Sequence, residues 1–167
     1  MAKTIFPSIR QIREDFSELS FAPHEVFHWS PHKNTVFYDP QKITKPSGIY
    51  QLLHEVGHAL SKHCYYESGV HLIRIESEAW HKAQVLAEKY GLAIDQDHIE
   101  SSLDSYRDWL HLRSTCPQCQ SVSLETKLNH YHCFNCMQKW KVPSDQRSRY
   151  YRRKIDFGDL NTKMSAI

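Results

Sequence analysis

The 167-residue sequence has few of the residues that mark disordered or disulfide-stabilised chains. It holds 5 glycines, 7 prolines and 5 cysteines, and 40% of its residues are hydrophobic. This composition is typical of a globular protein with a buried core, and five cysteines are few for a secreted disulfide scaffold. The sequence has no run of the roughly 18 to 20 apolar residues that a membrane span needs. Its first 16 residues mix charged with apolar side chains, unlike a secretory signal. We therefore expect a cytoplasmic protein with no membrane association.

Neither sign of charge dominates, but the charges are unevenly distributed. The net charge is +2. Residues 1–112 carry 11 basic and 15 acidic side chains, whereas residues 113–167 carry 10 basic and 4 acidic ones. The change of sign predicts a domain boundary near residue 112, with the basic part as the anion-facing one. We expect a core over 1–112, a small module over 113–144 and a basic tail over 145–167.

Periodic apolar residues predict four helices and a β-hairpin. Ser8 stands three residues before Gln11, which is the spacing of a capping box, and an apolar stripe follows. Apolar residues recur at helical spacing over 49–60, 75–90 and 99–110, with Gly91 as a C-cap and Asp97 as a cap of the last helix. The β-prone segments 26–29 and 35–38 flank a turn-rich segment and predict a hairpin. The first 112 residues are thus expected to form an α+β core.

The five residues His54-Glu55-Val56-Gly57-His58 fall in the second predicted helix. Residues four apart lie one above the other on a helix, so both imidazoles can bind one ion with Glu55 beside them. A catalytic zinc site has three protein ligands and a water, whose pKa the metal lowers to about 7 so that Glu55 can take its proton. Chance would produce this pattern in roughly 5% of chains with this composition. The amphipathic helix around it favours a catalytic site over a histidine-rich surface helix.

A third zinc ligand is expected near or on the next helix. Counted at 100° per residue from Ala79, the apolar positions centre near zero, Glu76 lies at about +60° and Glu78 at about −100°. Glu76 therefore leans toward the interior and is the preferred ligand, while Glu78 and His71 remain alternatives. Several residues near the motif are candidates for stabilising an oxyanion, namely His63, His71, Tyr50 and Tyr66.

The motif and the carboxylate together resemble the ImmA/IrrE-like metallopeptidases, which combine a His-Glu-x-Gly-His helix with a Glu-x-x-Ala on the next helix. The matching residues are 54–58 and 76–79, and the resemblance covers about residues 34 to 90. It implies a minimal zincin-like core, zinc on His54, His58 and Glu76, Glu55 as general base, and substrate pairing along an edge strand at 35–38. SprT-like metalloproteases are the alternative resemblance. They use a histidine as third ligand, which would be His71, and often carry a cysteine module.

Four of the five cysteines form two Cys-x-x-Cys pairs separated by thirteen residues. They are Cys116, Cys119, Cys133 and Cys136. Four thiolates in two such pairs are the ligand set of a closed structural zinc site, and a redox pair is the weaker interpretation. Tyr131, Phe134 and Trp140 can supply a small core, and Asn129 can turn the chain between short strands. Residues 113–144 therefore predict a small β zinc ribbon, which brings the expected zinc ions to two, one catalytic and one structural.

The ribbon and the tail hold many basic residues interleaved with aromatic ones. The segment 146–154 has five basic and no acidic side chains. Such residues can bind phosphates and stack on bases, and the simpler interpretation is a solvated basic surface. The candidates are Lys127, Lys139, Lys141, Arg147, Arg149, Arg152 and Arg153, with Trp140, Tyr150 and Tyr151. The fifth cysteine, Cys64, is expected to be a small buried residue.

The motifs together favour a zinc-dependent endopeptidase acting on a protein or peptide substrate, such as a regulatory or DNA-associated protein. The alternative is a nucleic-acid- or protein-binding regulator that works through the ribbon. In that case the histidine motif on residues 54–58 would be a structural or inactive metal site.

Overall fold

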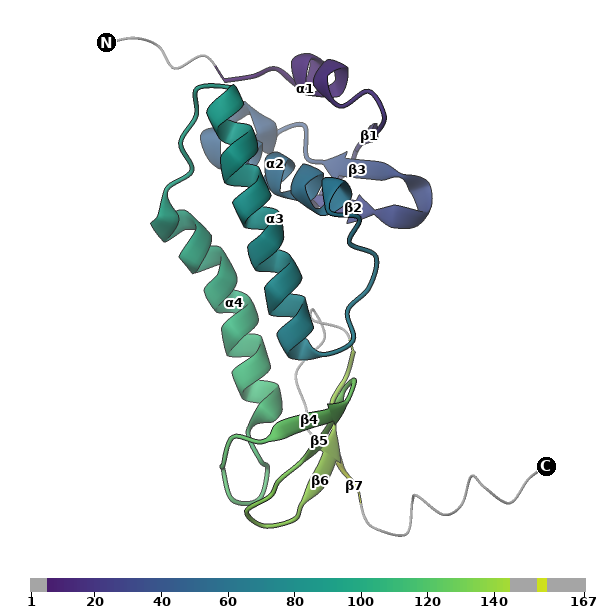
Figure 1. The fold of residues 1–167 in the computed structure, drawn as a ribbon, viewed down its shortest axis with the longest axis vertical. Coiled ribbons are helices and arrows are strands. Elements are labelled where there is room, and N and C mark those ends of the chain that lie inside the picture. Colours follow the sequence, from purple (N-terminus) through teal and green to yellow (C-terminus); the bar gives the residue numbers. More distant parts are fainter. Residues whose placement is uncertain (1–5, 145–152, 156–167) are drawn as a thin grey trace, which may run out of the picture. The chain divides into compact units, whose positions relative to one another are not determined.

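The computed structural model describes residues 6–144 and, for the backbone, 153–155. The fold is mixed α+β, as predicted, and it divides into two compact units (Figure 1). The core unit comprises residues 1–65 and 74–103, and the ribbon unit comprises 66–73 and 104–167. The boundaries at 112 and 144 stay predictions, and the rest of the basic tail lies outside the described residues. Within the described part of the chain, no helix combines the length and the apolar character of a membrane span.

The core unit holds a three-stranded sheet with the order β1-β3-β2, built from β1 (Ser20–Pro23), β2 (His28–Ser30) and β3 (Thr35–Tyr38). The predicted hairpin is confirmed, because β2 and β3 pair antiparallel around a turn in which Asn34 is left-handed, with φ of 47°. The strand β1 was not predicted, and it pairs parallel to β3. The expectation of an edge strand at 35–38 is therefore wrong, since β3 is paired on both sides and β2 is an edge.

The first two helices begin close to where the sequence places them. Helix α1 spans Ile9–Asp15, and its N-cap Ser8 accepts a hydrogen bond from the backbone amide of Gln11 at 3.2 Å. A short 3-10 turn, η2 (Lys42–Thr44), then leads into α2 (Pro46–Leu60). Pro46 stands at the first position of α2, where its fixed φ favours a helix and its missing amide costs no hydrogen bond.

The other two helices differ from the prediction at their starts. Helix α3 spans Gly69–Lys89, so it begins before the apolar segment 75–90 from which it was predicted. Gly91 follows it with φ of +66°, which is the left-handed conformation expected of a C-cap glycine. Helix α4 spans Gln96–Ser114, and its first turn is held by Asp95, whose carboxylate accepts from the amide of Asp97 at 3.3 Å. Asp95 thus takes the capping role that was predicted for Asp97.

The core of this first unit lies where α2 packs against the sheet and against α3. Val36, Leu52, Leu53 and Val56 are fully buried, and Trp80 is 2% exposed. Burying a side chain of this size stabilises a fold by about 1.5–3 kcal/mol. The same packing fixes the orientation of the polar residues of α2. Cys64 does not belong to this core, contrary to expectation, because it lies exposed after the end of α2.

The ribbon unit holds an antiparallel sheet with the order β4-β5-β6-β7. Its strands are β4 (Leu124–Lys127), β5 (His130–His132), β6 (Lys139–Lys141) and β7 (Arg153–Ile155). Tyr131 and Trp140 stack with ring centroids 5.4 Å apart and are buried, as predicted. Asn129 makes the expected turn with φ of 66°. Phe134 is not part of this small core, because 64% of its surface is exposed.

Candidate metal centres

Helix α2 buries the three polar residues of its histidine motif in the interior of the core unit. His54, Glu55 and His58 are each exposed by less than a tenth of their surface, and so is Glu76 on α3. Four buried titratable side chains in one place are unusual, because charged groups are costly to bury unless they are paired or bind a metal. Glu78, two residues further along α3, keeps 52% of its side-chain surface exposed. The helical phase of α3 thus orients these two carboxylates as the sequence predicts.

Two histidine nitrogens and one carboxylate oxygen converge on a single point. His54 Nε2 lies 3.1 Å from His58 Nε2, and Glu76 Oε2 lies 3.1 Å from His54 Nε2 and 3.5 Å from His58 Nε2. A tetrahedral ion bound at 2.0–2.2 Å separates its ligand atoms by about 3.3–3.6 Å, so the triangle fits a small divalent cation. Among the described residues, the only groups that could hold a metal ion are this triad and the four cysteines.

The triad depends on a close approach of two helices at Gly57. A methyl group at this position would lie 2.5 Å from the carbonyl oxygen of Ala79 on α3 and 3.2 Å from Cβ of Lys82. Only a residue without a side chain lets α2 come this near to α3 (Figure 1). Gly57 therefore positions the carboxylate of Glu76 against His54 and His58.

A Gly57→Ala substitution should destabilise the protein, although alanine normally favours a helix over glycine by about 1 kcal/mol. The new methyl group would collide with backbone atoms, and such overpacking costs about 1–3 kcal/mol. We expect a lower melting temperature by circular dichroism and weaker zinc binding at the triad, because α3 must move away. A variant that melts at or above the wild-type temperature would contradict this packing.

Burial and the two imidazoles set the charge state of the carboxylates. Burial alone would raise the pKa of Glu76, but hydrogen bonds with His54 and His58 lower it to about 2. Glu76 is therefore ionised, as a metal ligand must be. Burial raises the pKa of Glu55, and the nearby charges of His54 and His58 offset only part of that shift. Glu55 is thus a more basic carboxylate than Glu76, which is the property that a general base requires.

The backbone of the edge strand holds Glu55 in place. The amide of Trp29 in β2 donates a 2.8 Å hydrogen bond to Oε2 of Glu55. Trp29 lies opposite Val36 of β3. Because its amide donates to Glu55, the amide points away from β3 and toward α2. In an antiparallel pair both backbone groups of such a residue face outward. The carbonyl of Trp29 is therefore directed to the same side, next to the buried carboxylate.

The two histidines of the triad are oriented by different contacts. His54 stacks on Trp80 with ring centroids 4.3 Å apart, and its buried Nδ1 has no hydrogen-bond partner among the described residues. His58 places Nδ1 2.9 Å from Nδ1 of His63, whose Nε2 lies 3.4 Å from Glu78 Oε2. If His58 binds a metal through Nε2, its proton sits on Nδ1 and is donated to His63. His63 then carries its own proton toward Glu78.

A His63→Ala substitution should weaken metal binding at the triad by about 10- to 100-fold, because it leaves the Nδ1 proton of His58 without an acceptor. The measurement is competition for zinc with a chelator, on protein whose cysteine site is already filled. His71→Ala is the matched control. Among the described residues, His71 belongs to neither group that could hold a metal ion, and its Nδ1 accepts from the amide of Glu67 at 3.2 Å. A strong effect of His71→Ala with none of His63→Ala would reverse these two assignments.

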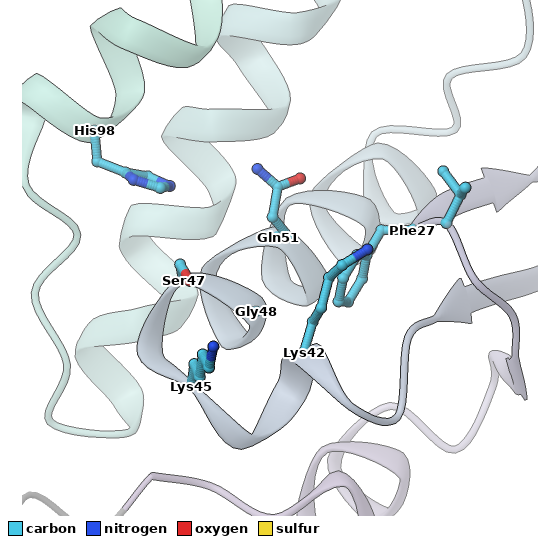
Figure 2. A pocket seen from close by; sticks show the side chains of 8 residues that line it. Phe27, Lys42, Lys45, Ser47, Gly48, Gln51 and His98 are labelled. Carbon is cyan, nitrogen blue, oxygen red and sulfur yellow. The ribbon is translucent and has the colours of Figure 1, made fainter.

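A cavity of about 530 Å³ lies beside the first turns of α2, where Ser47, Gly48 and Gln51 line it (Figure 2). Gln51 lines it one helical turn before Glu55, on the face of α2 that carries the motif. Phe27 enters from the segment before β2, and His98 enters from α4. His98 Nε2 is buried with no hydrogen-bond partner among the described residues. Lys42 and Lys45 also line the cavity, and Lys42 pairs with Asp39 at 2.9 Å. No pattern in the sequence predicted this recess.

The four cysteines of the ribbon unit form the second group. Sγ of Cys116 lies 3.5 Å from Sγ of Cys136, and Sγ of Cys119 lies 3.5 Å from Sγ of Cys133. Each Cys-x-x-Cys turn is followed by a left-handed residue, Gln120 with φ of 64° and Met137 with φ of 63°. The two turns therefore share one conformation and present their sulfurs to a common centre.

The ionisation of the thiols also fits a bound cation. Hydrogen bonds from Ser121 and Asn135 lower the pKa of Cys119 to about 5. The backbone amide of Gln138 favours the thiolate of Cys136, but burial and the neighbouring sulfurs raise its pKa to about 12. Four thiolates so close together repel one another, and a divalent cation removes that repulsion. Closed sets of four thiolates are typical of structural zinc.

Comparison with known protein families, curated proteins and solved structures finds no match to this chain. The roles of the two candidate metal centres therefore rest on their own geometry.

Proposed function

We propose that the core unit is a zinc-dependent endopeptidase. The observation that carries the proposal is the convergence of His54, His58 and Glu76 beside the buried Glu55. Three protein ligands leave a fourth position for water or substrate, which is typical of catalytic zinc, whereas structural sites are closed by four ligands. This donor count favours a peptidase over a structural or inactive metal site. The zincin-like character of the core and the resemblance to ImmA/IrrE-like enzymes belong to the same proposal.

The roles of the residues follow from their positions. His54, His58 and Glu76 would hold the zinc ion, which would supply Lewis-acid chemistry that makes a water molecule acidic enough to be deprotonated near neutral pH. Glu55 accepts the proton of the attacking water and passes it to the amine that leaves. The hydrogen bond from the amide of Trp29 holds one carboxylate oxygen of Glu55 and leaves the other free to move the proton.

The edge of β2 offers a place for an extended substrate. The outward-facing carbonyl of Trp29 can accept a hydrogen bond from a peptide that adds to the sheet as a further strand. A strand paired there would run past Glu55 and then past the cavity around Gln51. That cavity would receive a substrate side chain. Lys42 is paired with Asp39, so Lys45 is the lining lysine that favours an acidic side chain at this position.

The identity and position of the metal can be tested by anomalous scattering at the zinc edge. We expect one ion at the four cysteines and one at His54, His58 and Glu76, the latter with an open coordination position. If the second ion had four protein ligands and no water, the site would be structural and the proposal would fail.

The activity can be tested without knowing the natural substrate. Zinc-loaded protein is incubated with a peptide library prepared from a whole proteome, and new termini are identified by mass spectrometry. Cleavage sites absent from a parallel Glu55→Gln sample are those that the triad produces. The cavity predicts that acidic residues are enriched a fixed distance from the cleaved bond.

A further inference from the structure

We infer that one face of the ribbon sheet binds single-stranded nucleic acid. Strand register places five basic or imidazole side chains on this face, which we call the cationic face. They are Lys127, His130, His132, Lys139 and Lys141. His132 pairs with Lys139 and His130 pairs with Lys141, so these residues point to one side of the sheet. The surface does not depend on the proposed peptidase activity.

The other face of the same sheet is used for folding. Tyr131 and Trp140 are opposite each other on it and bury their stacked rings. Glu125, which pairs with Tyr131, lies on this inner face as well. It is the only acidic residue between 113 and 144. Its carboxylate accepts hydrogen bonds from the amides of Asn129 and Gly69, each at 2.6 Å.

The one arginine of the ribbon segment is also turned inward. Arg113 is 1% exposed, and its guanidinium donates to the carbonyl of Pro143 and the side chain of Asn129. It also lies over the ring of Trp109 at 4.0 Å. The charged groups of Arg113 and Glu125 thus make contacts inside the ribbon unit. The charge that segment 113–144 presents on the cationic face is positive, with no acidic side chain there to offset it.

A recess and an exposed aromatic side chain adjoin the cationic face. The recess, of about 250 Å³, is lined by four residues of this face, Lys127, His130, His132 and Lys139, and also by Thr126, Tyr131 and Trp140. Phe134 stands beside it with 64% of its surface exposed, and its ring centre lies 4.8 Å from that of His132. A large aromatic side chain held in the open beside lysines is the combination that stacks on a base while cations bind the phosphates. Bases are accessible in this way in a single strand and not inside a duplex.

The test uses the full-length, zinc-loaded protein and a fluorescein-labelled 20-nucleotide oligothymidylate, with binding followed by anisotropy at several salt concentrations. Lys127→Gln/Lys141→Gln should reduce the slope of log affinity against log salt by about 1.4, at 0.7 per phosphate contact. Phe134→Ala should weaken binding by about 5- to 150-fold. Lys82→Gln/Lys89→Gln removes two exposed lysines of α3 and should change neither quantity.

Several outcomes would overturn the inference. The first is that the slope of log affinity against log salt is unchanged in the Lys127→Gln/Lys141→Gln variant. The zinc content of this variant must equal that of the wild type, so that the ribbon is known to be folded. The second is complete loss of binding on changing Arg147, Arg149 and Arg152 to glutamine while the variants of the cationic face bind normally. The third is equal or tighter binding of a 20-base-pair duplex. Competition by a polyglutamate peptide as strong as that by the oligonucleotide would instead identify an acidic protein segment as the partner.

Discussion

A Glu55→Gln variant is expected to bind zinc at the triad as tightly as the wild type and to lose peptide cleavage by about 10²- to 10⁴-fold, the usual contribution of a general base. Glutamine keeps the size of the side chain and can still accept the hydrogen bond from Trp29. It cannot take a proton from water. The variant should therefore cleave peptides from the library more slowly than the wild type. Its zinc content, measured by elemental mass spectrometry, should be unchanged.

Glu78→Gln is the matched control for this experiment. It removes a carboxylate from the neighbouring helix, but one that is half exposed and faces His63. Cleavage should persist in this variant, with at most a modest loss of zinc affinity through His63. Equal loss of cleavage in both variants would show that the effect is general, and wild-type cleavage by Glu55→Gln would exclude Glu55 as the base.

A Cys133→Ser variant is expected to lose the fold of the ribbon sheet and one of two zinc ions. Cys133 is fully buried, and structural zinc contributes about 10–16 kcal/mol of apparent binding free energy to small domains of this kind. The sheet has few other sources of stability, since its core consists mainly of Tyr131 and Trp140. Without the metal these rings should become exposed.

The indole resonance of Trp140 reports on this change. Its Nε1 donates a 3.0 Å hydrogen bond to the carbonyl of Arg113, which a disordered ribbon would lose. In Cys133→Ser the resonance should move to the position of a solvent-exposed indole, while the zinc at the triad remains. Cys64→Ser is the control, because that cysteine is exposed and lies outside both metal centres. Two zinc ions and an unshifted resonance in Cys133→Ser would refute the structural role.

The local periodicity of the sequence was enough to predict the helices and the orientation of the carboxylates. Helix α3 buries Ala79, Ala83 and Leu86 on one side, so the phase of Glu76 follows from the spacing of apolar residues. The hairpin was predictable for a similar reason, because the two β-prone segments are close in sequence. Such signals depend on neighbours within a few residues.

Features that depend on contacts far apart in sequence could not be predicted in this way. The parallel pairing of β1 with β3 has no local signature, and it is what turns 35–38 from an edge into a central strand. The hydrogen bond from Trp29 to Glu55 comes from a backbone amide, which every residue except proline carries. Phe134 and Cys64 are apolar enough to be assigned to cores, yet the structure exposes both. Hydrophobicity alone does not say which apolar side chains stay outside.

The crossing of α2 and α3 at Gly57 links metal binding to the stability of the fold, and so to the amount of protein that persists in a cell. His54 and His58 lie on one helix and Glu76 on the other, so a complete set of ligands exists only when the helices are docked. An ion that binds only the folded chain adds about 2.7 kcal/mol of stability when its free concentration is a hundred times its dissociation constant. If the triad holds zinc as proposed, a cell starved of zinc would contain more of the unfolded chain and would degrade it faster. The supply of the metal would then set the abundance of the protein as well as the proposed activity.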